Sequence, residues 1–385
     1  MLNNLQKEIV HQIAFEKSAI DAVETYCLFK DILKGIVIIK SSDEEGAVNL
    51  YEPFEKIENI EQNLYTPFDK GKVYFFSART FKTLSLSGVT ITCNQRCISF
   101  DTQTISYLDR YYKGQEREMP SNIKCVLELM KLRQIGVDNI PYLMENLLLS
   151  NRNEESVKDT LLSFEALFYN AKRPIRNKIY IMKTLRNFQR MRKNFEYKRM
   201  YYLLYIILMK MSYIQLRHNK KTLEEKMDMM CRYMKEELRT ILIAELILAK
   251  KYFERGQSFN FFGKVQRGRV DLLETLKNMA WDLYHLRLLE YECVWPTNPY
   301  ADIFVPYFYT YDKRLLEARE CYKLEALAID KRTRSHYPFY VYENEIVPFV
   351  QKLGIGNNRE KRSPLSENEV KKLITKEEEL LKGLV

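Results

Sequence analysis

The sequence predicts a mixed α/β chain, and three observations lead to this fold class. RCISF (96–100) and IFVPYFYTY (303–311) are short β-rich runs, and each is followed by an acid and then by a helical pattern. Residues 155–292 repeat apolar side chains at helical spacing almost without a break, which predicts a large helical region between the two runs. Hydrophobic residues make up 46% of the 385-residue chain and charged residues 29%, the balance of a folded protein with a sizeable core.

The first 95 residues are predicted to hold a helix and three strands. Apolar residues recur at roughly helical spacing up to about residue 26. GIVIIK (35–40) and KVYFF (72–76) are β-rich runs, and LSGVTITC (86–93) alternates around a glycine. This region is either a small α+β module of its own or a set of strands added to the edge of the sheet that follows.

Charge and cysteine content narrow the class of protein. The net charge is +10, from 61 basic and 51 acidic residues, which indicates an anionic partner. The seven cysteines are odd in number and scattered, so reduced thiols are expected rather than a disulfide framework. The N-terminus lacks the apolar segment of a signal peptide, and the most apolar run, 200–214, is too short to span a membrane. We therefore expect a cytoplasmic protein with no membrane partner.

Four acids have strongly apolar neighbours instead of lying in solvated charge runs: Asp101, Glu145, Asp282 and Asp312. Asp101 and Asp312 each follow a β-rich run and precede a helical pattern. If the two strands are parallel neighbours in one sheet, these acids meet at the same edge, where open α/β sheets bind ligands. For Asp101 alone, a helix N-cap is an equally good explanation, because an aspartate accepts hydrogen bonds from free backbone N–H groups at a helix start.

Clustered carboxylates favour a divalent cation. They repel one another and raise each other's pKa, and a bound cation removes that penalty. Carboxylate oxygens with few imidazoles suit Mg²⁺ or Mn²⁺ rather than zinc, and the chain has only four histidines. Two such ions can activate a water and hold both oxygens of a phosphodiester displacement. The acids therefore predict a magnesium or manganese site that acts on phosphodiesters.

Four short motifs resemble those of PIN-like nucleases. ISFDTQTISYL resembles the first motif of that family, in which a strand ends in an aspartate followed by Thr or Ser. FYTYDKRLLE resembles its late T-x-D-x-x-L element, and WDLYHLRLLE resembles its helix-borne third acid. The middle acid of the family is usually a glutamate on a helix, for which Glu145 in PYLMEN is our choice and Glu165 in SFEALF the alternative.

The resemblance implies a three-layer α/β/α sandwich around a mainly parallel sheet, with an acidic metal pocket at the strand ends. The catalytic core would comprise residues 96–154 and 269–350. Because Glu145 and Asp282 are far apart in the chain, residues 155–268 are expected to be a helical insertion. Residues 1–95 would form the N-terminal module or sheet extension, and 351–385 a C-terminal loop and helix.

The resemblance also implies a metal-dependent endonuclease that acts on RNA more readily than on DNA. Asp101, Asp282 and Asp312 would bind the metal, Glu145 would complete the pocket, and Thr102 and Thr310 would orient water or ligands. His285, one helical turn after Asp282, is either an assistant of this site or a packed helix histidine. Such a protein is compatible with a toxin or host-defence role, with an inhibitory protein partner or with a homo-oligomer.

The stretch 171–199 carries eleven basic residues and one acid, so its net charge equals that of the whole chain. Lys and Arg bind phosphates, and the interleaved aromatic residues can stack on unpaired bases. The alternative is a solvated helix face whose aromatic residues point into the core. The predicted nucleic-acid contacts are Lys172, Arg173, Arg176, Lys183, Arg186, Arg190, Arg192 and Lys193.

Two other function classes stay open on the sequence. In a non-catalytic nucleic-acid-binding or scaffold protein, the acids are caps and surface groups, and the stretch 171–199 does the binding. In a helical protein-interaction module, the β-rich runs are buried helices, and the basic face meets an acidic protein. The positions of Asp101, Asp282 and Asp312 in the fold discriminate among these classes.

Overall fold

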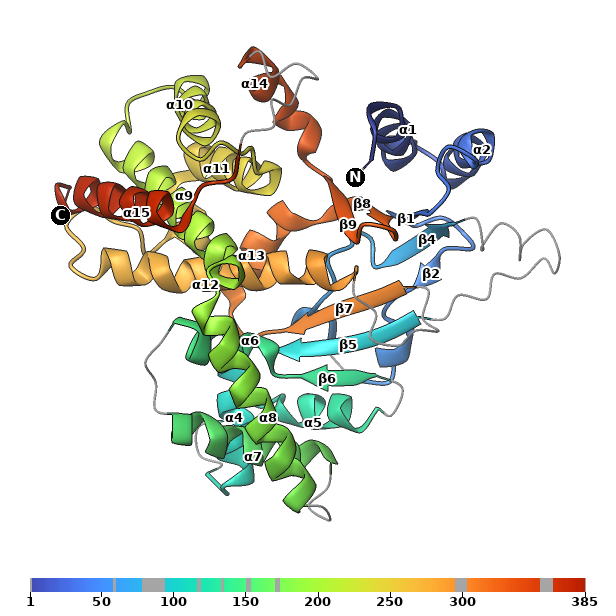
Figure 1. Cartoon of the computed structure of the whole chain (residues 1–385), viewed down its shortest axis with the longest axis vertical. Coiled ribbons are helices and arrows are strands. Elements are labelled where there is room, and N and C mark those ends of the chain that lie inside the picture. The colour runs from blue at the N-terminus through green and yellow to red at the C-terminus, as the bar shows by residue number, and fades with distance from the viewer. Residues whose placement is uncertain are drawn as a thin grey trace. The chain divides into compact units, whose positions relative to one another are not determined.

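The computed structural model describes residues 2–57, 60–77, 94–115, 119–132, 135–149, 154–169, 174–294, 303–353 and 363–384. The protein is mixed α/β, as predicted (Figure 1). It divides into two compact units. The first comprises Met1–Lys193, Leu288–Tyr311 and Lys323–Phe339; the second comprises Asn194–Arg287, Asp312–Tyr322 and Tyr340–Val385. The predicted strand at 86–93 lies outside the described residues.

A four-stranded sheet in the first unit has the order β3–β7–β5–β6. β5 (Asn94–Phe100) is parallel to both of its neighbours, β7 (Ile303–Tyr309) and β6 (Gly136–Asp138). β3 (Leu64–Tyr65) pairs antiparallel with β7. In the register, the last residue of β5 lies opposite the last residue of β7, so the two strands end together. The predicted parallel pairing of these two runs is confirmed.

Pro306 lies within β7, and the pairing of that strand explains why a proline is tolerated there. β3 covers only Phe308 and Tyr309 of β7. At Pro306, β7 is therefore an edge strand on the β3 side, and an edge position does not need a backbone N–H. The residues around it are buried on both faces of the sheet, as parallel strands require: Val305, Tyr307, Phe308 and Tyr309.

The second sheet is five-stranded, with the order β2–β4–β1–β8–β9. β1 (Ile36–Ser41) pairs antiparallel with β4 (Lys72–Phe76) and with β8 (Leu324–Asp330). The edge strands are β2 (Val48–Asn49) and β9 (Ser335–Tyr340). The sequence pattern predicts neither β8 nor β9. LEALAID, the sequence of β8, is rich in residues that favour helices, and it becomes a strand because β1 provides a partner.

The N-terminal region folds as two helices rather than the single helix predicted up to about residue 26. α1 is Asn4–Phe15, and α2 is Ala19–Phe29. The break occurs because the Ser18 side chain accepts a hydrogen bond from Asp21 N and caps α2. Both helices bury apolar residues against the second sheet, in a core that includes Ile9, Val10, Ile13, Tyr26, Ile36, Ile38 and Phe76.

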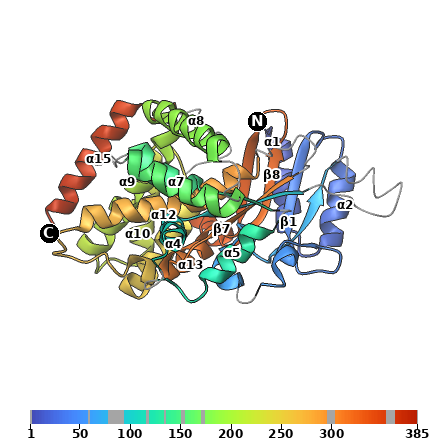
Figure 2. The same cartoon turned by 90° about the horizontal axis from the view of Figure 1, so that it is seen from below.

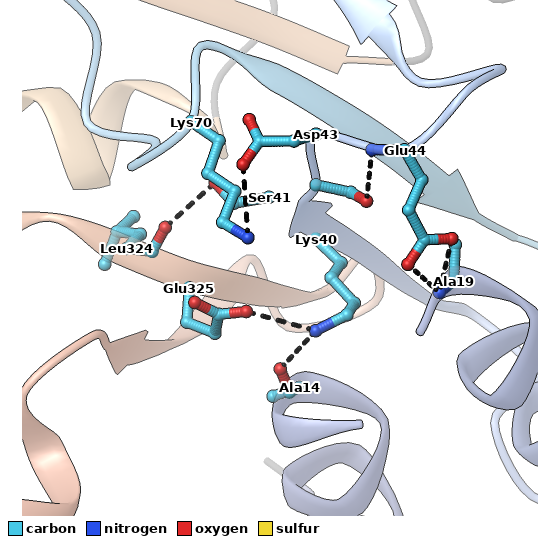
Figure 3. Close-up of polar contacts among 10 residues, drawn as sticks. Ala14, Ala19, Lys40, Ser41, Asp43, Glu44, Lys70, Leu324 and Glu325 are labelled. Atoms are coloured by element: carbon cyan, nitrogen blue, oxygen red, sulfur yellow. Dashed lines mark hydrogen bonds and ion pairs between the residues drawn. The ribbon is translucent and has the colours of Figure 1, made fainter. Parts of the chain in front are cut away.

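The facing ends of α1 and α2 are held by charged side chains at the end of β1 (Figure 3). Lys40 is only 3% exposed; its Nζ donates to the carbonyl of Ala14 at 2.7 Å and pairs with Glu325 Oε1 at 3.2 Å. The Glu44 carboxylate accepts from the backbone N–H of Ala19 at 2.9 and 3.0 Å. A cation thus lies at the carbonyl end of α1 and an anion at the amide end of α2, which complements both helix dipoles.

Replacing Lys40 by methionine is expected to lower the free energy of unfolding by about 2 kcal/mol, because two charge-assisted hydrogen bonds are lost. Methionine keeps the apolar stem but leaves the Ala14 carbonyl and Glu325 without their donor. Urea unfolding followed by circular dichroism measures the effect. Lys34→Met is the control, because Lys34 is exposed, and its expected effect is within about 0.5 kcal/mol. Equal midpoints for the two variants would contradict the prediction.

The remaining helices of the first unit follow the parallel strands. α4 (Thr102–Tyr112), α5 (Ile123–Lys131) and α6 (Ile140–Leu143) occur where helices are predicted, and α6 continues as the π-helical segment η4 (Met144–Leu149). α7 (Glu154–Tyr169) packs against α4 and α8 (Pro174–Lys193), and α8 packs against η4 (Figure 2). The predicted insertion, 155–268, is therefore divided between the two units.

The second unit is mainly helical. α9 (Glu196–Arg217) packs against α10 (Leu223–Glu236), α11 (Ile243–Arg255) and α15 (Glu367–Lys382). Further helices are α13 (Lys313–Ala318), α14 (Val347–Lys352) and α12 (Leu272–Glu292), of which the part from Leu288 onward belongs to the first unit. Short 3₁₀ turns occur across the chain at Glu52–Phe54, Ile60–Gln62, Gly256–Ser258, Asn260–Phe262, Arg319–Tyr322 and Glu343–Glu345.

The structure describes six of the seven cysteines, and all six are free. Among the described helices, none combines the length and the apolar character that a membrane crossing requires.

Candidate functional site

Asp101 directly follows β5 and is the N-cap residue of α4. Its Oδ1 accepts a hydrogen bond from Thr104 N at 2.6 Å, so the capping explanation is confirmed for this oxygen. Its Oδ2 accepts from Thr310 Oγ1, also at 2.6 Å, and Thr310 directly follows the neighbouring strand β7. One carboxylate therefore caps a helix and also faces the end of the parallel strand pair.

Glu145 joins this group through Thr102, whose Oγ1 donates to Glu145 Oε2. Glu145 is half-buried and lies in η4, the π-helical continuation of α6. Single π-helical turns inside helices occur frequently at functional sites. The structure thus brings together four residues singled out in the sequence: Asp101, Thr102, Glu145 and Thr310, referred to below as the Asp101 cluster.

Three tyrosines that sequence reasoning missed lie beside the Asp101 cluster. The ring of Tyr311 lies 5.4 Å from that of Tyr309 and 5.5 Å from that of Tyr107. Burial raises the pKa of Tyr309 to about 12, and the negative charge of Asp101 contributes to this shift. The Tyr309 hydroxyl therefore stays protonated at neutral pH. In the sequence, only their positions mark these tyrosines. Tyr309 and Tyr311 flank Thr310 in YTY, and Tyr107 belongs to ISYL, in the helix that follows Asp101.

A further acid that the sequence analysis does not single out, Asp138, ends β6, the other parallel neighbour of β5. Its Oδ2 accepts from Ser99 Oγ at 2.9 Å and from Cys97 Sγ at 3.2 Å. Its Oδ1 accepts from Ile140 N at 2.9 Å, at the start of the helix that continues to Glu145. Asp138 therefore connects the middle of β5 to the helix that carries the second acid of the Asp101 cluster.

Asp138 and Glu292 are half-buried residues whose carboxyl groups interact through their charges. Burial raises the pKa of Asp138, and burial together with the charge of Asp138 raises the pKa of Glu292 well above its ordinary value. The pair was not visible in the sequence because β6 is only three residues long and its side-chain partners come from another strand and from α12. In the sequence, the pair is indicated only by the position of Asp138 directly before NIP (139–141), where a helix is predicted to start.

Glu165, the alternative middle acid, lies on α7 and is 5% exposed. Its neighbour Phe164 contacts the ring of Phe100, the residue before Asp101, at 6.3 Å. Burial raises the pKa of Glu165 to about 7. Glu165 is thus on a helix beside the Asp101 cluster, but the acid that is hydrogen-bonded to Thr102 is Glu145.

We expect Glu165 to make stability depend on pH. Its ordinary pKa is 4.5 and its pKa in the folded protein is about 7, so the folded state binds the proton more tightly. The resulting stabilisation is fully present below pH 4.5 and is lost as pH rises through about 7. The melting temperature of Glu165→Gln, followed by differential scanning fluorimetry, should therefore fall less than that of the wild type across this interval. Glu155→Gln, at an exposed position on the same helix, should show the same dependence of melting temperature on pH as the wild type. If Glu165→Gln also shows that dependence, the pKa of Glu165 is not raised.

Asp282 and Asp312 line one pocket of about 150 Å³ in the second unit. Asp312 caps α13 by accepting from Arg314 N at 2.8 Å, and its Oδ2 pairs with Arg314 Nη2 at 3.1 Å. Lys264 and Arg269 add positive charge to the lining. The structure therefore groups the four predicted acids as two pairs, Asp101 with Glu145 in the first unit and Asp282 with Asp312 in the second.

His285 is a buried residue of α12 and is 4% exposed. Its ring stacks near Trp281, with centroids 6.0 Å apart, and it does not line the pocket that contains Asp282. Burial lowers its pKa to about 3, so the imidazole is uncharged at neutral pH. Of the two explanations for His285, this position supports a packed helix histidine rather than an assistant of the metal site.

The predicted nucleic-acid contacts fall partly outside the described residues. Lys172 and Arg173 lie outside them, and so does the side chain of Arg176. The other five are exposed or half-buried residues of α8: Lys183, Arg186, Arg190, Arg192 and Lys193. The aromatic residues of the stretch 171–199 are of two kinds: two are buried, as in a solvated helix face packed on the core, and two are exposed, as base stacking requires. Phe188 and Phe195 are buried, whereas Tyr180 and Tyr197 are 58% and 46% exposed.

The Asp101 cluster offers only oxygen donors, two carboxylates and two hydroxyls. Within the described ranges, no three side chains of His, Cys, Asp or Glu are arranged to hold a metal ion together. The likeness to PIN-like nucleases rests on four short motifs of the sequence. Compared with known proteins, this chain is matched by no family model, no curated protein and no solved structure.

Proposed function

We propose that this protein is a metal-dependent endonuclease that hydrolyses phosphodiesters at the Asp101 cluster. The observation that supports this most is the joining of Asp101 and Glu145 through Thr102 at the carboxyl ends of β5 and β7. Ligands of open α/β sheets bind at this edge. The PIN-like family and its three-layer α/β/α arrangement around the parallel strands are part of the proposal.

The donor chemistry of the Asp101 cluster fits Mg²⁺ or Mn²⁺. Magnesium in proteins is typically held by one or two carboxylates and completes its octahedral shell with waters and substrate phosphates. Asp101 and Glu145 would hold such an ion, which when bound supplies an activated water and charge neutralisation. Thr104 N and Thr310 Oγ1 fix the Asp101 carboxylate, and Thr102 Oγ1 fixes Glu145. Asp282 and Asp312 are a second pair of carboxylates with the same donor chemistry.

A nucleic acid is the proposed substrate, with RNA preferred to DNA by the resemblance. The net charge of +10 supports an anionic partner. The packing of α8, which is rich in basic residues, against the segment that carries Glu145 supports it further. Growth arrest on expression in a host cell, relieved in a cleavage-deficient variant, would support a toxin or defence role; an inhibitory protein partner is part of that role.

The test is cleavage of end-labelled single-stranded RNA and DNA in Mg²⁺, in Mn²⁺ and in EDTA. We expect cutting with either ion and none in EDTA. Glu145→Gln keeps the side-chain size and an acceptor for Thr102 but removes the charge, so it should lose activity. Glu155→Gln is the matched control, because Glu155 is an exposed residue paired with Lys158. Failure of both ions would instead support a non-catalytic nucleic-acid-binding protein. Equal cutting by both variants would show that Glu145 takes no part in catalysis and would contradict the proposed site.

A further inference from the structure

One face of α8 forms a groove of about 570 Å³ in the first unit. We define the α8 groove by four cations and two apolar residues of its lining: Lys178, Lys183, Arg186, Arg190, Ile179 and Met182. The opposite face of the helix is apolar and buried, through Ile181, Leu185 and Phe188. The groove face is therefore left open on a helix that is already anchored to the core.

In the part of the chain that the structure describes, the cations of the α8 groove have no acidic partner. None of the four forms an ion pair with a described residue, and no acid is among the described lining residues. Elsewhere in this unit Lys113 pairs with Asp109 and Lys158 with Glu155. Lys183, Arg186 and Arg190 follow one another at intervals of three and four residues, so they repeat along the helix axis about every 5–6 Å. A row of unpaired cations of this kind fits a polyanion with regularly spaced charges.

Apolar side chains lie among these cations. Ile179 is 65% exposed and Met182 is 42% exposed, and Tyr180 beside them is 58% exposed. Such surface fits the flat faces of nucleobases, which are accessible only when a strand is unpaired. In a duplex these faces are stacked and hidden, and the deep, narrow major groove of an RNA duplex does not admit a helix.

We propose that the α8 groove binds single-stranded nucleic acid, with phosphates on Lys183, Arg186 and Arg190 and bases against Ile179 and Met182. The choice of nucleic acid rests on the proposed function, and the binding itself is separable from cleavage. A membrane surface fits less well, because an interfacial helix buries its apolar face in lipid. The apolar face of α8 is packed inside the protein, and the cations share the groove with the exposed apolar residues. α8 also packs against η4, the element that carries Glu145, and Figure 1 shows α8 beside α6, which η4 continues.

The test is fluorescence anisotropy of the full chain in EDTA, with a labelled single-stranded oligoribonucleotide and with its duplex. The triple variant Lys183→Gln, Arg186→Gln, Arg190→Gln should bind the single strand about tenfold more weakly or worse. The slope of log affinity against log salt should become shallower by about 0.7 for each lost phosphate contact, about 2 in all. The matched control replaces three exposed lysines of the same unit by glutamine, Lys30, Lys34 and Lys331, and should bind as the wild type does.

A second variant tests the apolar part of the groove. Ile179→Ser with Met182→Ser should weaken binding of the single strand about tenfold, the scale of one lost stacking contact, and leave the salt slope unchanged. Equal affinity of the triple variant and its control would overturn the proposal, and so would duplex binding as tight as single-strand binding. Binding to phosphatidylserine vesicles in place of oligonucleotide, lost in the triple variant, would replace the nucleic acid by a lipid surface. In the wild-type protein, binding without metal-dependent cleavage would refute only the nuclease. Metal-dependent cleavage together with equal affinity of the triple variant and its control would refute only the groove.

Discussion

Asp101→Asn is expected to abolish metal-dependent cleavage while leaving the protein folded. Asparagine caps helices as well as aspartate does, so its side-chain oxygen can still accept from Thr104 N and preserve the start of α4. The substitution removes the negative charge that a cation requires, and it replaces the oxygen that accepts from Thr310 Oγ1 by an amide nitrogen. We expect kcat to fall on the order of 10³-fold, the scale on which a single electrostatic group contributes at a catalytic site. The measurement is single-turnover cleavage in Mn²⁺ beside the melting temperature of each variant.

Two further variants separate capping from catalysis at Asp101. Asp101→Ala removes the cap as well as the charge, so it should lose the same activity and about 1 kcal/mol of stability in addition. Thr310→Val removes the donor to Asp101 Oδ2 and should lower activity by about 10- to 100-fold, because such a partner orients a ligand without binding the ion. Wild-type cleavage by folded Asp101→Asn would show that Asp101 is a helix cap and nothing more.

The part of the site that the sequence predicts is the part encoded by local pattern. A buried run, an acid and a helix start occur within a few residues around Asp101, and parallel strands bring their ends together as a consequence of sheet geometry. The helical spacing around Glu145 likewise indicates which face of its helix is apolar. Residues whose role follows from such local rules can be chosen before the fold is known.

The part that the sequence does not predict depends on partners distant in the chain. β8 has the composition of a helix and is a strand because β1, far away in the sequence, pairs with it. Asp138 is half-buried and interacts with groups from β5 and α12, and three residues of strand give no periodic signal. A hydrophobic pattern predicts the structure of one segment at a time, whereas the structure of β8 and the surroundings of Asp138 depend on pairing between segments that are distant in the sequence.

The basic stretch 171–199 also shows that a sequence pattern does not reveal which residues belong to the same unit of the fold. As a sequence, 171–199 is one run of positive charge. In the structure, α8 ends at Lys193 and α9 begins at Glu196, and the unit boundary falls between them. Phe195, at this junction, is buried, which ends the solvated face. Charge pattern therefore predicts a class of partner, but only packing shows which residues share one surface.

The largest effect on stability is expected at Arg287, in the core of the second unit. Arg287 Nε donates to Glu245 Oε1 at 2.8 Å, and Nη2 donates to Glu245 Oε2. The hydroxyl of Tyr340 accepts from Arg287 Nη1, and the hydroxyl of Tyr322 donates to Glu245 Oε1 at 3.1 Å. The side chains of the pair are 7% and 0% exposed. Arg287→Met should lower the free energy of unfolding by about 3–5 kcal/mol, because it leaves a buried carboxylate without its counter-charge.

Urea unfolding followed by circular dichroism measures this loss, and Arg232→Met in the same unit is the control. Arg232 is 63% exposed and pairs with Asp228 one turn away, so its removal should cost about 0.5 kcal/mol or less. The double variant Arg287→Met, Glu245→Leu should recover most of the loss, because two apolar groups of similar volume need no counter-charge. Recovery would show that the unpaired charge, rather than lost packing, destabilises the single variant. A single-variant cost no larger than that of Arg232→Met would contradict the prediction, and a double variant as unstable as the single one would assign the cost to packing around Tyr322 and Tyr340.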